Sequence, residues 1–194
     1  MKLVVFFVLM NIIFFISCKQ TSTEKETKKT SSKDTTTFFP VADYIQQQIK
    51  LVDSTPYFMY LISIRNGKKD SSQINTHQFD SLVQPFREID ISNPSIKKNY
   101  TESVFEDKST QSYTLTYSTN NKSLSTQNID VLLNEENQQV KRIFINCFYD
   151  NNDSAITQKL GWKSFHSCSI IRIIQYKNGK QSTEQNLIVW NDKD

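Results

Sequence analysis

The apolar positions of this chain change their spacing along its length. The first 17 residues are mostly apolar, and residues 19–37 contain no aliphatic or aromatic side chain. From Phe38 onwards, apolar residues recur first at helical spacing and then in alternation with polar ones. This order predicts a leader, a polar linker and a folded part in which helices precede strands.

Two helices are predicted at the start of the folded part. A first run at helical spacing follows Pro40 and ends at Asp53-Ser54-Thr55-Pro56. Its apolar members are Val41, Tyr44, Ile45, Ile49 and Val52. The second helix is predicted to begin at Thr76, which can act as its N-cap, and to kink or restart at Pro85. Each helix has one apolar face, so we expect both to pack on a sheet.

The rest of the pattern predicts an antiparallel sheet. Asn66-Gly67 and Asn178-Gly179 are typical of hairpin turns, and no proline follows Pro94. The predicted strands are residues 57–65, 70–75, 100–106, 111–118, 126–134, 139–149, 163–177 and 181–190. We therefore predict an α+β fold, a curved antiparallel sheet of about seven or eight strands with two helices packed on one face. Residues 38–194 are expected to form this single domain.

Two segments are apolar at consecutive positions rather than at alternate ones, namely residues 143–149 and 170–174. Strands of this kind are apolar on both faces, and helices can cover only one of them. The other face requires a second cover. The sheet can roll over a second small core, the loop around Leu160-Gly161-Trp162 can cover it, or it can bind an apolar ligand or a partner.

Cys147 and Cys168 lie in two successive predicted strands. If these strands pair with Ile145 opposite Ile170, the cysteines face each other and a cross-strand disulfide is allowed. The alternative is two buried free thiols. The same register brings His166 close to both cysteines, but no fourth ligand is apparent. We therefore predict no metal site, no cofactor and no catalytic residue.

Composition and charge narrow the function further. Three glycines in 194 residues exclude Gly-rich phosphate-binding loops. The net charge of +3 comes entirely from Lys2 and residues 19–37, which leaves 17 basic and 17 acidic side chains in residues 38–194. A neutral domain lacks the basic surface that nucleic-acid backbones require, so nucleic acid is not an expected partner.

The leader ends in Phe15-Ile16-Ser17-Cys18, which resembles the lipobox of bacterial lipoproteins. The resemblance implies a signal peptide over residues 1–17 and a lipid attached to Cys18, which becomes the first residue of the mature chain. Residues 18–37 would then be a lipidated, disordered tether, because they cannot bury enough apolar surface to offset the entropy of ordering. Lys19 stands where inner-membrane lipoproteins commonly have Asp, which resembles sorting to the outer membrane, facing the periplasm.

Three phrases of the folded part resemble an uncharacterised group of small envelope lipoproteins. They are residues 38–45, 52–56 and 110–118. The resemblance implies a cell-envelope address and no activity. We therefore expect a non-enzymatic lipoprotein that binds an envelope protein or acts as an accessory subunit. The alternative is a carrier or sensor of an apolar ligand in the concave face of the sheet.

The lipid anchor gives a first testable prediction. Substitution Cys18→Ala should release the protein from membranes and remove the acyl mass increment, because each buried methylene of the lipid contributes about 0.8 kcal/mol to membrane binding. Membrane flotation and mass spectrometry of the intact protein measure both effects, with Ser31→Ala as the control. A Cys18→Ala protein that still floats and keeps the acyl mass would refute the anchor.

Overall fold

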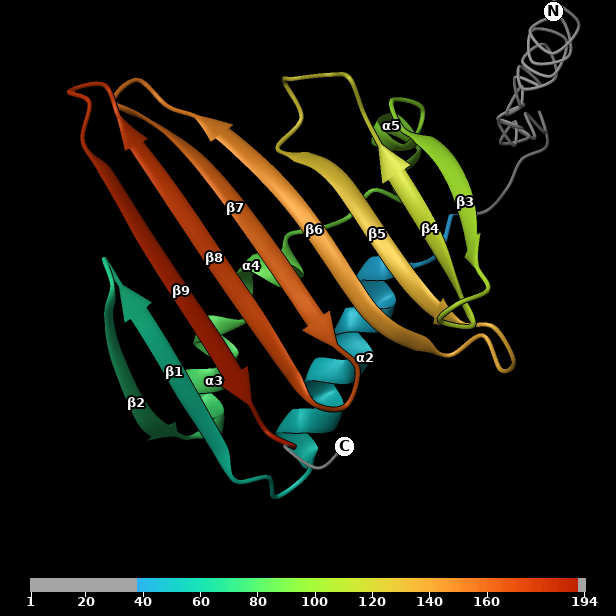
Figure 1. Ribbon diagram of the computed structural model, residues 1–194, viewed down its shortest axis with the longest axis horizontal. Helices are drawn as coiled ribbons and strands as arrows, with labels where there is room; N and C mark the ends of the chain where they lie inside the picture. Colours follow the sequence, from blue (N-terminus) through green and yellow to red (C-terminus); the bar gives the residue numbers. More distant parts are fainter. Residues whose placement is uncertain (1–37, 192–194) are drawn as a thin grey trace, which may run out of the picture. The chain divides into compact units, whose positions relative to one another are not determined.

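The computed structural model describes residues 38–191, so the predicted signal peptide, the predicted tether and Cys18 lie outside the described residues. These residues form four helices and nine strands (Figure 1). The helices are α2 (Val41–Ser54), α3 (Thr76–Leu82), α4 (Gln84–Arg87) and α5 (Pro94–Lys97). None of the helices in this part of the chain is long and apolar enough to cross a membrane.

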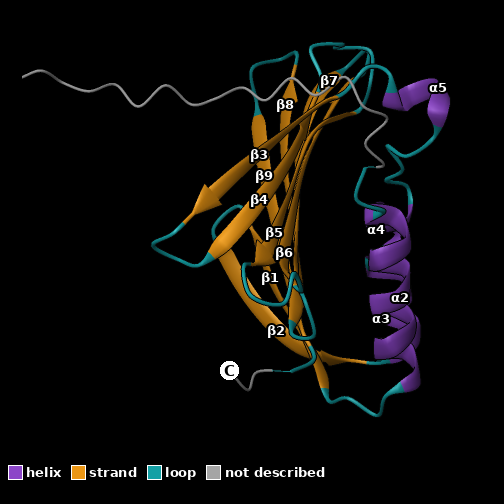
Figure 2. Ribbon diagram, turned by 90° about the vertical axis from the view of Figure 1, so that its right-hand side faces the viewer, coloured by secondary structure: helices purple, strands orange, loops and turns teal. Residues whose placement is uncertain are grey.

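All nine strands belong to one open antiparallel sheet, in the order β2-β1-β9-β8-β7-β6-β5-β4-β3. They are β1 (Met59–Arg65), β2 (Lys68–Ile74), β3 (Thr101–Asp107), β4 (Ser112–Ser118), β5 (Thr126–Asn134), β6 (Val140–Asp150), β7 (Ser154–Lys163), β8 (Ser167–Tyr176) and β9 (Gln181–Val189). The strands from β3 to β9 form a meander, and the β1–β2 hairpin joins it by pairing β1 with β9. Figure 2 shows the twisted sheet from the side, with the helices on one of its faces.

The prediction of an antiparallel sheet with helices is confirmed, but the strand number is wrong. Residues 154–163 form β7 between β6 and β8, whereas a loop is predicted around residues 160–162 and a strand only from residue 163. Buried Leu160 and Trp162 alternate along this strand, but buried Gln158 interrupts the apolar pattern. The strand was missed because one polar side chain in the core hides its period of two.

Both Asn-Gly sequences lie in hairpin turns, as predicted. Asn66 and Gly67 have φ of 48° and 83°, and Arg65 pairs directly with Lys68. Two consecutive positive φ values are characteristic of the two-residue turn that matches strand twist. In the β8–β9 hairpin, Gly179 alone has positive φ, at 82°.

The second predicted helix is divided in two. Asn75, rather than Thr76, is the N-cap of α3, and its side chain accepts a hydrogen bond from the backbone N–H of Gln78 at 2.9 Å. The Gln78 side chain accepts in return from the Asn75 backbone N–H, which completes a capping box. The chain then restarts as α4, with Pro85 in its first turn. The predicted restart at Pro85 is therefore confirmed, and the predicted cap is wrong by one residue.

An aromatic cluster joins the helices to the sheet. Trp162 of β7 packs edge-on against Phe86 of α4, with ring centroids 5.1 Å apart. Trp190, directly after β9, contacts Trp162 at 5.3 Å and lies edge-on to Phe79 of α3 at 5.8 Å. Aromatic pairs of this geometry add about 0.5–1.5 kcal/mol each to the effect of burial.

This cluster predicts a large stability difference between two phenylalanines. Substitution Phe86→Ala should lower the free energy of unfolding by about 3–5 kcal/mol, because it leaves a cavity beneath Trp162. Phe105→Ala should change it by less than about 1 kcal/mol, because Phe105 is 61% exposed in β3. Urea unfolding followed by circular dichroism measures both values. Equal losses would contradict this account of the core.

Candidate functional site

The two faces of the sheet differ in how they are covered. Trp162 points towards the helices, and successive side chains of a strand point to opposite faces, so Gly161 and Lys163 lie on the face away from the helices. We call this second face the open face. Its middle row runs across four strands in register, from Phe144 through Gly161 and Ser169 to Leu187.

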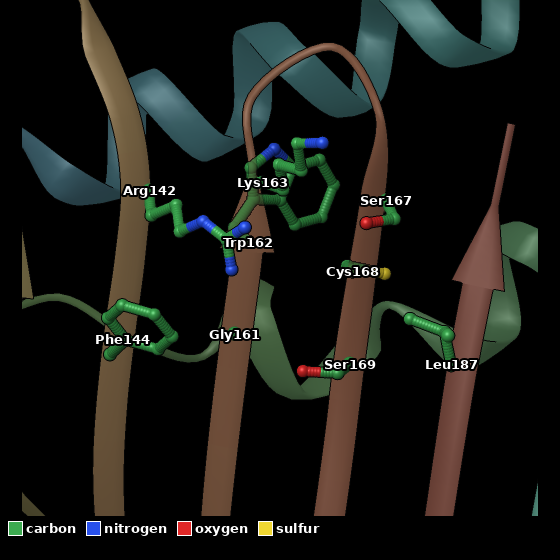
Figure 3. Close-up of a pocket in the computed structure, with 9 residues that line it drawn as sticks. All are labelled: Arg142, Phe144, Gly161, Trp162, Lys163, Ser167, Cys168, Ser169 and Leu187. Carbon is green, nitrogen blue, oxygen red and sulfur yellow. The ribbon is translucent and has the colours of Figure 1, made fainter. Parts of the chain in front are cut away.

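A pocket of about 160 Å³ lies on the open face above Gly161 (Figure 3). A Cβ atom on Gly161 would lie 2.6 Å from Ser169 Oγ and 3.7 Å from a ring carbon of Phe144. The missing side chain therefore makes the floor of the pocket, with the Phe144 ring on one side. Leu187 lines it beyond Ser169.

Two cations stand at one end of this pocket. Arg142 of β6 is directly opposite Lys163 of β7, and Lys163 is opposite Ser167 of β8. Like charges in direct cross-strand pairs destabilise a sheet. No His, Asp or Glu lines the pocket, and a bound anionic group would be attracted to this end of it. The arrangement can bind an anion beside an apolar group.

Large apolar side chains surround the pocket on the same face. Phe144, Phe148 and Leu187 are 43%, 39% and 38% exposed, and Ile171 and Ile173 of β8 are half-buried between them. Clustered exposed apolar side chains, rather than scattered ones, mark binding surfaces.

The predicted pairing of Cys147 with Cys168 is wrong. Strand β7 lies between their strands, with Cys147 opposite Gln158 and Cys168 opposite Trp162. Two strand spacings amount to about 9.6 Å, which exceeds the roughly 7 Å between Cα atoms that a disulfide can bridge. Both cysteines are buried free thiols on the helix-covered face.

The surroundings of the two thiols are typical of structural cysteines. Burial raises the pKa of both Cys147 and Cys168. Thr126 Oγ1 lies 3.9 Å from the sulfur of Cys147, and burial raises the pKa of nearby Tyr149 to about 12. A thiol held protonated in this way is a poor nucleophile and a poor metal ligand.

His166 is not beside the cysteines as the predicted register required. It lies in the turn between β7 and β8, and its Nδ1 is 3.2 Å from the carbonyl oxygen of Asn191. Within residues 38–191, no three His, Cys, Asp or Glu side chains gather closely enough to hold a metal ion.

The residues of the pocket were missed by the sequence analysis. Gly161 and Lys163 line the pocket because residues 154–163 form a strand. Arg142 belongs to the pocket because it lies opposite Lys163. The available signal was a glycine between two large apolar residues, Leu160 and Trp162, which often marks a close approach in a strand.

Comparisons with protein-family models, with curated proteins and with solved structures gave no match to this chain.

The corrected sheet predicts two reduced, unreactive thiols. In the native protein at pH 8, Cys147 and Cys168 should react with an aromatic disulfide reagent far more slowly than an exposed cysteine, because their raised pKa keeps the thiolate scarce. After denaturation without reductant, two thiols should titrate, since the sulfur of Cys18 is expected to carry the lipid. Cys147→Ser should reduce the count to one. A count of zero in the unreduced wild-type protein would contradict the pairing of β7 between β6 and β8.

Proposed function

We propose that this protein is a lipid-anchored protein of the bacterial envelope that uses the open face of its sheet to bind a partner protein and performs no chemistry there. The observation that carries the proposal is the pocket above Gly161, where Arg142 and Lys163 stand beside the exposed apolar side chains of Phe144 and Leu187. The lipobox-like sequence at Cys18 supports the envelope address, and Lys19 supports the outer membrane.

The charge of the open face indicates the kind of partner. Arg142, Lys159 and Lys163 all lie on it, in β6 and β7. The acidic residues on the open face of β5 and β6 are Asp130, opposite Phe144, and Asp150 at the far end of β6, and the open-face positions of β7, β8, β9 and β1 contain none. Such a surface complements an acidic segment, and electrostatic complementarity favours both the rate and the specificity of association.

The size of the pocket favours a protein over a small ligand. Sites for small molecules usually measure about 300–1,000 Å³, whereas this pocket measures about 160 Å³. A volume of this size suits one side chain of a partner, held between Phe144 and Leu187. Interfaces are commonly centred on a single anchor of this kind. The alternative of an apolar-ligand carrier has less support, because that function needs a larger cavity.

The pocket also lacks most of the groups that catalysis uses. Activating a serine such as Ser167 requires an adjacent base. Lys163 lies opposite Ser167, but no histidine or carboxylate lines the pocket beside them. These features support a binding function.

Site-specific photocrosslinking in the native envelope tests the proposal. Leu187 on the open face and Leu51 in α2 are both 38% exposed, so they are a matched pair of positions for a photoreactive residue. We expect position 187 to give one discrete protein adduct that position 51 does not give. Mass spectrometry would identify the partner, which would then be purified for direct binding measurements.

The measured affinity gives the decisive result. The double variant Arg142→Glu/Lys163→Glu should weaken binding at least about tenfold, because it reverses both charges at the pocket. The control Lys50→Glu/Lys98→Glu makes the same charge change at two exposed positions of the helical layer and should leave the affinity unchanged. Equal effects of the two variants, or an adduct with a lipid in place of a protein, would overturn the proposal.

A further inference from the structure

The two edge strands of the open sheet are protected to different degrees. Strand β2 begins with Lys68, Lys69 and Asp70, all exposed. Charged residues, lysine above all, prevent the unwanted pairing of edge strands. Strand β3 has no lysine or proline, and its seven residues pair with β4 without a bulge. The β3 edge is therefore regular, and its charged residues are all acidic.

The middle of β3 is apolar on both faces. Val104 is 59% exposed and Phe105 is 61% exposed, and as neighbours in a strand they point to opposite faces. Within residues 38–191, β4 is the only strand paired with β3, so the backbone N–H and C=O groups on its outer side have no strand partner. An added strand would satisfy these groups and cover both side chains.

The charges of β3 indicate the chemistry of such a strand. Glu102 and Glu106 flank Val104 on one face, where half-buried Glu102 also interacts with the hydroxyl of its cross-strand neighbour Tyr117, and Asp107 follows at the end of the strand. The cation nearest to Glu106 is Lys108 at 3.9 Å, in an exposed pair that screens the carboxylate only weakly. The edge is therefore acidic around an apolar centre.

A second copy of the chain is a poor occupant. Two β3 strands related by a twofold axis pair all seven residues in one register only, centred on Val104. This register places Glu102 of each copy opposite Glu106 of the other, and directly opposed like charges destabilise a sheet. The acidic edge instead complements a basic strand.

We propose that β3 binds an extended basic segment of a partner protein, which adds to the sheet as an antiparallel strand. The segment presents cations opposite Glu102 and Glu106 and apolar residues opposite Val104 and Phe105. From its N-terminal end, the segment therefore has a cation, two apolar residues, one residue of any kind and a second cation. Backbone pairing provides the affinity and the two glutamates provide the specificity. This surface is separate from the pocket above Gly161, and the inference does not depend on the proposed function.

A synthetic peptide tests the inference directly. The probe is the fluorescently labelled peptide TKVVTKT, and its binding to the full-length protein in detergent micelles is followed by fluorescence anisotropy at low salt. We expect saturable binding, and at least about tenfold weaker binding by the double variant Glu102→Lys/Glu106→Lys. The control Glu135→Lys/Glu136→Lys makes the same charge change in the β5–β6 turn and should bind as the wild type does.

Methylated peptides distinguish strand addition from simple charge attraction. In an antiparallel strand, alternate N–H groups point towards the neighbour. Methylation of the peptide's backbone nitrogens that point towards β3 should abolish binding. Methylation of the alternate nitrogens, which point away from β3, should be tolerated. Equal tolerance of both sets, equal binding by the two charge variants, or no binding by the wild type would overturn the inference. A dimer in sedimentation experiments that Glu102→Lys disrupts would also overturn it, in favour of a second copy.

Discussion

The packing of Trp162 against Phe86 is the contact on which the layered arrangement depends. Helices α3 and α4 contain seven and four residues, which is too short for either to be stable alone in water. They form because Trp162 and Trp190 provide a large apolar surface against which Phe79 and Phe86 pack. A helical layer attached in this way covers one face of the sheet. The side chains on the second face must therefore tolerate contact with water or with a partner.

This constraint explains how a domain without net charge acquires distinct surfaces. Trp162 must face the core, so its neighbours Gly161 and Lys163 must face outwards. The open face becomes cationic and partly apolar, while the β3 edge is acidic around an apolar centre. Charges of one sign gather locally, at the pocket and at the β3 edge, and such local patches favour contacts with partners of the opposite charge.

The sequence predicted those elements whose pattern is local. Helix α2 follows from apolar residues at helical spacing, and β5 has the predicted bounds, Thr126–Asn134. Strand β7 is not predicted, because buried Gln158 breaks the alternation of apolar and polar positions. That single omission also caused the errors in the cysteine pairing and in the position of His166. The pocket depends on the register of β6, β7, β8 and β9 together, and local patterns do not determine such long-range register.

The pairing of β1 with β9 has a consequence for how the protein is made. Tyr60 of β1 pairs with Val189 of β9, so the second neighbour of β1 is a strand more than 100 residues further along the chain. A two-stranded hairpin such as β1–β2 is marginally stable by itself, and distant pairings of this kind slow folding. During synthesis the sheet therefore stays incomplete until residues 181–189 have emerged, and the free edge of β1 is open to other chains until then.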